Sequence, residues 1–177
     1  MQASSARLFR DDARKCTKLE MQDGTVFLWE PIRGSFLETC FDSDGAVIDQ
    51  LRIDHPVKER IAYVLSSSNA EAAEASGFSE IVLKRGCPKC GAEPLRRCLD
   101  GHASGSVPII PLHSCSACGS RCYMLTDKYL ARLVERNRQL FNEQESKSID
   151  ADNGAFMSEL RENIIRIFAS KKLLCIL

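Results

Sequence analysis

The sequence predicts an α+β protein in which an antiparallel β-meander with a helix precedes a four-cysteine segment and two C-terminal helices. Three observations predict this class. Short runs of β-branched and aromatic residues fill the first third of the chain, four cysteines form two matching pairs in the middle, and two stretches with apolar residues at helical spacing follow. We therefore expect three parts, an acidic meander with helices at 1–78, the cysteine segment at 79–125 and C-terminal helices at 126–177.

The meander is predicted from three runs, 25–30, 35–41 and 46–53, that are rich in β-branched and aromatic residues. An Asp-Ser-Asp-Gly turn at 42–45 separates the last two runs, and its glycine can adopt positive φ. The carboxylates of this turn are expected to bond to nearby backbone amides, because the chain lacks the spacing and the downstream glutamate of a calcium loop here. Short turns between neighbouring runs predict antiparallel pairing.

A helix is predicted directly after the meander, with Asp54 as its cap and Pro56 at its second position. Its apolar stripe is formed by Val57, Ile61, Val64 and Leu65. The alanine- and glutamate-rich stretch from Ala70 to Ser76 predicts a second, short helix that ends at Gly77. This spacing also resembles a helix-turn-helix, but a recognition helix from Ser79 would run into the first cysteine pair, so a strand is expected there.

Two short turns in the middle of the chain repeat one pattern, CPKCG at 87–91 and CSACG at 115–119. Each turn can direct two sulfurs toward one point, and its glycine supplies the backbone conformation that such a turn often needs. Paired cysteines of this kind in an intracellular protein are more often metal-binding or redox-active than structural disulfides. We therefore predict one Zn²⁺ site. Its ligands are Cys87, Cys90, Cys115 and Cys118.

The 24 residues between Cys90 and Cys115 leave room for two strands, and apolar segments flank both turns. In this pattern the segment at 79–125 resembles the zinc-ribbon group. The resemblance implies a structural zinc ion with a closed shell of four thiolates and no open position for catalysis. It implies no particular biological role, because zinc ribbons serve many unrelated functions. The turns also resemble those of rubredoxin, so an iron electron carrier is an alternative.

Other potential ligands lie near the paired cysteines in the sequence, namely Cys98, Cys122, His102 and His113. A rival ligand set would combine the first cysteine pair with Cys98 and His113. The two-turn assignment is preferred because each turn carries its own glycine and its own flanking apolar segments. The remaining cysteines are isolated in sequence and are interpreted as small buried side chains, and an odd total of nine argues against a disulfide framework.

Charge is distributed unevenly along a chain whose formal net charge is zero. Residues 1–83 carry nine basic and 14 acidic side chains, whereas residues 84–138 carry ten basic and four acidic side chains, a net charge of +6. Such a basic block indicates a face for nucleic acid or an acidic partner, although solvated charges on separate faces give the same totals. The expected contacts with nucleic-acid backbone are Arg96, Arg97, Arg121, Arg132 and Arg136.

Two amphipathic helices are expected after the cysteine segment. The first begins at Asp127 and places a basic face opposite an apolar one. A polar stretch at 142–154 separates it from a second helix at about 156–174, whose apolar stripe is continuous. The second stripe either folds back to complete the core or binds another chain, and folding back is the commoner use.

The sequence contains no phosphate-binding loop, nucleophile elbow or HExxH helix, so we expect a protein that is not an enzyme. The lack of a membrane-length apolar run and of a secretory signal predicts a cytoplasmic protein that does not associate with membranes. The leading hypothesis is a zinc-ribbon subunit that binds the backbone of DNA or RNA within a larger nucleoprotein assembly. The alternative is a protein–protein adaptor with a purely structural ribbon and an interface on the meander or the C-terminal helix.

Overall fold

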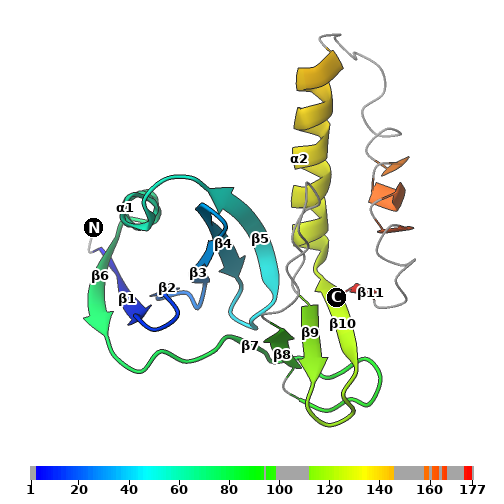
Figure 1. The fold of residues 1–177 in the computed structure, drawn as a ribbon, viewed down its shortest axis with the longest axis horizontal. Helices are drawn as coiled ribbons and strands as arrows, with labels where there is room; N and C mark the ends of the chain where they lie inside the picture. Colours follow the sequence, from blue (N-terminus) through cyan, green and yellow to red (C-terminus); the bar gives the residue numbers. More distant parts are fainter. Residues whose placement is uncertain are drawn as a thin grey trace. The chain divides into compact units, whose positions relative to one another are not determined.

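A computed structural model describes residues 3–93, 95–98, 112–145, 158–159, 161–163, 165–166 and 174–176. The chain divides into two compact units, Met1–Lys84 and Arg85–Leu177, which are described separately (Figure 1). Strands and helices occur in both units, and the α+β class is therefore confirmed. No helix in these described ranges combines the length and the apolar character needed to cross a membrane.

The first unit is built on a six-stranded sheet with the strand order β5-β4-β3-β2-β1-β6. Strands β1 to β5 are antiparallel to their neighbours, whereas β6 pairs in parallel with β1. A single helix, α1, spans Val57–Ser67. The strands are β1 at Ser4–Asp11, β2 at Cys16–Met21, β3 at Val26–Ile32, β4 at Ser35–Phe41, β5 at Val47–Ile53 and β6 at Ala70–Ala75, and the short strand β7 at Val82–Leu83 ends the unit.

Helix α1 covers one face of this curved sheet (Figure 1). The helix contributes Ile61 and Val64 to the apolar core, where they meet residues of four strands. The fully buried Trp29 lies in the same core. The other members of the cluster are Ala6, Leu8, Leu19 and Ile53. Burial of this apolar surface is the main force that closes the helix onto the sheet.

A buried ionic network fixes the same helix to the sheet. The carboxylate of Glu38, which is 6% exposed, accepts a hydrogen bond from the indole Nε1 of Trp29 at 2.8 Å. It also accepts two hydrogen bonds from the guanidinium of Arg60, at 2.8 and 2.7 Å. The hydrogen bond with Glu38 raises the pKa of Arg60, so this guanidinium stays charged at every pH that the folded protein meets. Three residues from β3, β4 and α1 are thereby joined at one carboxylate.

The turn between β4 and β5 has the chemistry predicted for it. The carboxylate of Asp42 accepts hydrogen bonds from the backbone amides of Asp44 and Ala46, both at 2.9 Å. Gly45 has a φ of +81°. A Cβ at this glycine would lie 2.1 Å from the carbonyl oxygen of Val82, so the position excludes any side chain. The chain that leaves β6 therefore passes directly over this turn.

The segment that contains this contact is fastened to the sheet at a second point. Lys18 on β2 is 1% exposed, and its Nζ donates hydrogen bonds to the carbonyl oxygen and to the Oγ of Ser79, both at 3.0 Å. The same ammonium lies 3.0 Å from a carboxylate oxygen of Glu20, 4.5 Å from the ring centroid of Phe9 and 5.2 Å from that of Phe78. Burial of a lysine is acceptable here because charge, carbonyl and aromatic partners replace its water.

Two expectations for the first unit are wrong. The stretch from 70 to 76, predicted to be a helix, forms strand β6, because β1 offers a free edge along which every residue from Ala70 to Ala75 has a partner. This nonlocal pairing overrides the helical preference of alanine and glutamate. The chain reverses into β6 at Asn69, whose φ is +47°. Helix α1 also starts differently, with Pro56 at the cap position and no side-chain capping hydrogen bond, so Asp54 does not cap it.

Strands β1 and β2 were not anticipated from the sequence. Their outward positions are charged, which obscures the alternation expected of a strand. In the sheet these charges pair across the two strands, as in the contact of 2.6 Å between Arg7 and Glu20. Cross-strand pairs of opposite charge stabilise two neighbouring antiparallel strands.

The described residues of the second unit form four strands in the order β11-β10-β9-β8 and the helix α2. β9 is antiparallel to both β8 and β10, whereas β11 pairs in parallel with β10. Thr126 caps α2, since its Oγ1 accepts a hydrogen bond of 3.0 Å from the amide of Tyr129. The elements are β8 at Leu95–Cys98, β9 at Leu112–Cys115, β10 at Arg121–Leu125, α2 at Asp127–Glu145 and β11 at Leu174–Ile176.

The expected C-terminal helices are described in part. α2 extends to Glu145 and so includes the first residues of the polar stretch that was expected to follow it. Within the second expected helix, the described residues at 158–159, 161–163 and 165–166 are helical. Leu174, which was assigned to the end of that helix, is instead the first residue of β11. The rest of the stretch from 146 to 173 lies outside the described residues.

Candidate metal centre

The two cysteine turns of the second unit have the same backbone. In the first, the amide of Gly91 donates to the carbonyl oxygen of Cys87 at 2.7 Å. In the second, the amide of Gly119 donates to the carbonyl oxygen of Cys115 at 2.9 Å. Both glycines have positive φ, +74° and +67°. The repeated sequence pattern thus folds into a repeated local structure, which points each pair of sulfurs in one direction.

The two turns also share a second backbone hydrogen bond, which involves the residue after the glycine. The amide of Cys87 donates to the carbonyl oxygen of Ala92, and the amide of Cys115 donates to that of Ser120, in each case at 2.9 Å. Ala92 and Ser120 therefore hold equivalent places in the two turns. We call each turn, extended to this residue, a knuckle, with the first knuckle at 87–92 and the second at 115–120.

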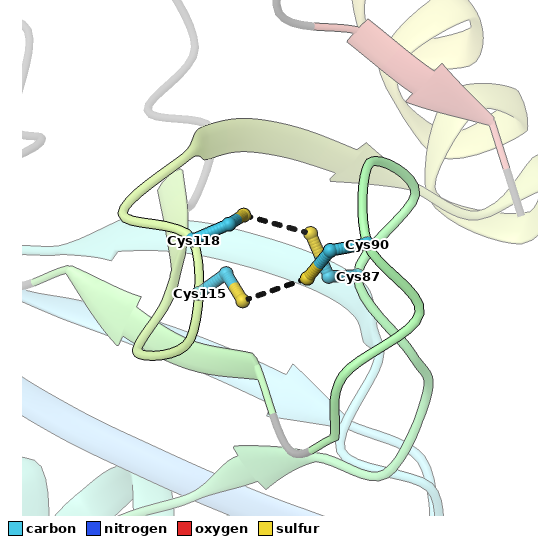
Figure 2. Close-up of side chains that lie close together, drawn as sticks. All are labelled: Cys87, Cys90, Cys115 and Cys118. Carbon is cyan, nitrogen blue, oxygen red and sulfur yellow. Dashed lines mark hydrogen bonds between the residues drawn. The ribbon is translucent and has the colours of Figure 1, made fainter.

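The knuckles face each other, and their four sulfurs converge (Figure 2). The Sγ atoms of Cys87 and Cys118 are 3.7 Å apart, and those of Cys90 and Cys115 are 3.6 Å apart. All four sulfurs lie within 4.8 Å of one another. The four cysteines are free, and these separations are far longer than the roughly 2.05 Å of a disulfide bond.

This spacing can be compared with the requirements of a metal ion. Four thiolates placed tetrahedrally at about 2.3 Å from a zinc ion stand about 3.8 Å from one another. The two measured separations, 3.7 and 3.6 Å, agree with that value to within about 0.2 Å. The donor set and its geometry therefore fit a tetrahedral metal ion.

Burial differs within each pair. Cys87 and Cys115, the first cysteine of each knuckle, are each 3% exposed, whereas Cys90 and Cys118 are exposed. The cluster thus has one pair of sulfurs in the protein interior and one pair at the surface.

The neighbouring groups also shift the pKa values of these cysteines in different directions. The hydroxyl of Ser120 lowers the pKa of Cys87 to about 6, with burial opposing it, and the same hydroxyl lowers the pKa of Cys118. The backbone amide of Ala92 lowers the pKa of Cys90, but hydrogen bonds with the neighbouring thiols outweigh it and raise that pKa to about 12. A divalent cation that binds four thiolates must displace the protons that these thiols carry.

The rival ligands are placed as follows. His113 is buried on β9, and its ring does not belong to the group of four converging donor atoms. Cys98 lies on β8 and Cys122 on β10, but their side chains are outside the described residues, as is the whole of His102. Among the described side chains, the four knuckle cysteines are the group that could hold a metal ion.

The basic residues singled out from the sequence are partly described. Arg121, at the start of β10, and Arg132, on α2, are exposed, and Arg136 on α2 is half-buried. Arg96 and Arg97 lie on β8, but their side chains are outside the described residues.

Ser120 is a site residue that sequence analysis missed. Its Oγ lies 2.8 Å from the sulfur of Cys118 and 3.3 Å from that of Cys87. The signal was present in the sequence, since the position two residues after the second cysteine of each knuckle is Ala92 in one and Ser120 in the other. Only the facing arrangement of the knuckles shows that this hydroxyl reaches a sulfur of the opposite one.

The chain was compared with protein-family models, with curated protein sequences and with solved structures, and none of them matches it. The function is therefore inferred from the residues and geometry of this chain alone.

Proposed function

We propose that the protein is a zinc-ribbon subunit that binds the phosphate backbone of nucleic acid and has no enzymatic activity of its own. The observation that carries the proposal is the convergence of four sulfurs from two matching knuckles. Zinc is the usual occupant of closed four-thiolate sites, and it stabilises small folds outright. When bound, it would cross-link the two knuckles and fix the strands that follow them.

The proposed nucleic-acid face rests on the charges of the same unit. Lys89 is exposed within the first knuckle, Arg121 follows the second knuckle directly, and Lys128 and Arg132 are exposed on α2. Such side chains hold phosphates through charge and hydrogen bonds without reading base sequence. This suits a subunit that is positioned on DNA or RNA within a larger assembly.

The charges have a competing explanation. A zinc ion with four thiolates carries a formal charge of −2, so nearby basic side chains would also stabilise the centre itself. The two explanations differ in the effect of removing the arginines. If the arginines bind nucleic acid, their removal lowers nucleic-acid affinity and leaves the zinc content unchanged. If they stabilise the metal centre, their removal lowers the affinity for zinc.

The test is fluorescence anisotropy of the zinc-loaded protein with labelled single- and double-stranded DNA and RNA over a salt series. Alanine replaces the five arginines of the proposal together: Arg96, Arg97, Arg121, Arg132 and Arg136. The slope of log K against log salt is expected to become shallower by about 0.7–0.9 for each phosphate contact that is lost. Zinc content, measured in parallel, is expected to stay unchanged.

A matched control replaces three exposed basic residues of the first unit, Arg33, Arg52 and Lys58, with alanine. This variant loses positive charge without touching the proposed face, so its salt slope is expected to equal that of the native protein. Equal slopes for all three proteins, or no binding at low salt, would refute the nucleic-acid proposal.

The second candidate is a protein–protein adaptor, and one exposed aromatic residue favours it. Tyr63 on α1 is 61% exposed, and the guanidinium of Arg60 lies 4.9 Å from the centroid of its ring. Tyrosine beside arginine is a frequent composition of binding hot spots. A Tyr63→Ala variant would then lose a protein partner while it retained any binding to nucleic acid.

The iron alternative is separated from zinc by colour. A rubredoxin-like centre absorbs visible light through its iron–thiolate bonds, whereas the d¹⁰ zinc ion leaves the protein colourless. Metal analysis of the purified protein and its visible spectrum therefore decide between the two.

A further inference from the structure

The two knuckles are equivalent in backbone but differ at one side chain. In both, the residue after the glycine accepts a hydrogen bond from the amide of the first cysteine, at 2.9 Å. That residue is Ala92 in the first knuckle and Ser120 in the second. The chain therefore contains an internal comparison, in which one knuckle carries a hydroxyl where the other carries only a methyl group.

The hydroxyl of Ser120 lies beside two of the four sulfurs. It lies 2.8 Å from the sulfur of Cys118, in its own knuckle, and 3.3 Å from the sulfur of Cys87, in the other. A hydroxyl that donates to a thiolate draws electron density from the sulfur and makes it a weaker nucleophile. The methyl group of Ala92 cannot donate, so the first knuckle gives Cys90 no corresponding protection.

The four cysteines also differ in their exposure to solvent. An attacking molecule in solvent can reach only an exposed sulfur, and Cys87 and Cys115 are each 3% exposed. Of the two exposed cysteines, Cys118 shares the short hydrogen bond with Ser120, to which its thiolate in a loaded centre could only be the acceptor, and Cys90 lies in the knuckle without the hydroxyl. Cys90 is therefore the exposed cysteine whose knuckle has no serine hydroxyl beside the sulfur.

We propose that Cys90 is an oxidation site, the sulfur at which a peroxide attacks the loaded metal centre, and that Ser120 directs the reaction there. This inference rests on the metal centre of the proposed function. It assigns to that centre a response to oxidants of the peroxide class, in which modification of Cys90 releases the metal.

The chemistry proceeds in two balanced steps. The Cys90 thiolate attacks one oxygen of hydrogen peroxide, so an S–O bond forms, the O–O bond breaks, and the departing hydroxide takes a proton to become water. The sulfur of Cys115, 3.6 Å away, then attacks the sulfenic acid of Cys90. An S–S bond forms, the S–O bond breaks and hydroxide leaves as a second water. The disulfide removes two of the four ligands, and the metal departs.

The experiment treats the full-length zinc-loaded protein with hydrogen peroxide and follows zinc release with a chromogenic chelator. Samples taken early are quenched with N-ethylmaleimide, and disulfides are mapped by mass spectrometry. Trypsin cleaves after Lys89, so Cys87 and Cys90 fall on different peptides and the two routes can be told apart. We expect the Cys90–Cys115 disulfide to form first and zinc release to follow it.

Three variants probe the role of the hydroxyl. Ser120→Ala is expected to raise the share of the Cys87–Cys118 disulfide about threefold. Loss of a hydrogen bond worth about one pKa unit raises the nucleophilicity of a thiolate by roughly half a log unit. Ala92→Ser is expected to slow formation of the Cys90–Cys115 disulfide by a similar factor of about three. Ser120→Thr keeps the hydroxyl and is expected to preserve the native distribution. Ser116→Ala removes another serine of the second knuckle and serves as the control.

The outcomes separate this inference from the proposed function. The assignment of Cys90 is overturned if the protein binds one zinc ion per chain but the early disulfides form equally by both routes. It is also overturned if Ser120→Ala does not change their distribution. A protein that binds no zinc or other metal overturns the proposed metal centre itself. Zinc content is measured for every variant before oxidation, so a variant that fails to fold is recognised before its reactivity is compared.

Discussion

The two units of the chain are stabilised in different ways. The first surrounds a single apolar core, with Trp29 fully buried and the carboxylate of Glu38 fixed between sheet and helix. Among the described side chains of the second unit, the buried apolar ones are two knuckle cysteines and four residues of α2. In the second unit, four converging sulfurs offer a site for a metal ion that would cross-link the two knuckles. Stability independent of metal is therefore expected only of the first unit.

Removal of the proposed metal ion is expected to have the largest effect, because it should destabilise the second unit and not the first. Structural zinc contributes about 10–16 kcal/mol to small zinc-binding folds at neutral pH. Chelation, or the substitution Cys115→Ser, is therefore expected to unfold the second unit and leave the first intact. Hydrogen exchange at 112–136 should rise sharply. The emission of Trp29, the only tryptophan and a core residue of the first unit, should not change.

Cys16→Ser is the matched control, because it removes a cysteine of the first unit that forms no disulfide and no sulfur of the cluster. It should bind metal as the native protein does. If chelation also exposes Trp29 to solvent, the two units do not differ in the proposed way.

A smaller effect is expected from the buried network of the first unit. Glu38→Ala removes the partner of both Trp29 and Arg60. Breaking a buried ion pair costs about 3–5 kcal/mol, and because the side chain of Arg60 is 23% exposed and can reach water, we expect about 3 kcal/mol. Denaturant unfolding followed by the emission of Trp29 measures this loss.

The exposed pair on the same sheet supplies the control. Arg7 is 68% exposed and contacts Glu20 at 2.6 Å, so Arg7→Ala should cost about 0–1 kcal/mol. Equal losses for the two variants would show that the buried Glu38 network stabilises the first unit no more than the exposed pair does.

The contact between the turn at Gly45 and Val82 can be tested with two glycines. Gly34→Ala places a Cβ in open space at a φ of +70°, so it should cost only the conformational term of about 1–2 kcal/mol. Gly45→Ala has a similar φ of +81° but its Cβ would meet the carbonyl oxygen of Val82. It is expected to cost about 1–3 kcal/mol more. Equal unfolding free energies for the two variants would contradict the close approach.

A smaller effect than that of Glu38→Ala is expected at Lys18. Lys18→Met keeps the length of the side chain but removes two hydrogen bonds to Ser79, the ion pair with Glu20 and the charge near the rings of Phe9 and Phe78. The loss should be about 1–2 kcal/mol and local. Hydrogen exchange at 78–84 should increase while the emission of Trp29 is retained. Unchanged exchange in this segment would show that Lys18 does not fasten it.

The features that the sequence predicted are those with local causes. The knuckles are set by cysteine and glycine spacing within five residues, and β3, β4 and β5 overlap the three runs from which strands were expected, with β3 extending two residues further, to Ile32. Strand β6 could not be found this way, because Ala70 to Ala75 are extended only through pairing with β1. Ser120 was missed for the same reason, since its contact with Cys87 crosses from one knuckle to the other. Nonlocal partners decided both of these errors.

The parallel pairing of β6 with β1 has a consequence for synthesis of the chain. Ser4 has its partner at Ala70 and Phe9 at Ala75, so β1 keeps an open edge until β6 has been synthesised. Pairs so distant in sequence slow folding, because the loop must close before the contact is gained. An open edge meanwhile invites pairing with another chain. A nascent chain that stops short of residue 70 is therefore expected to aggregate, whereas one that reaches residue 84 can complete the first unit.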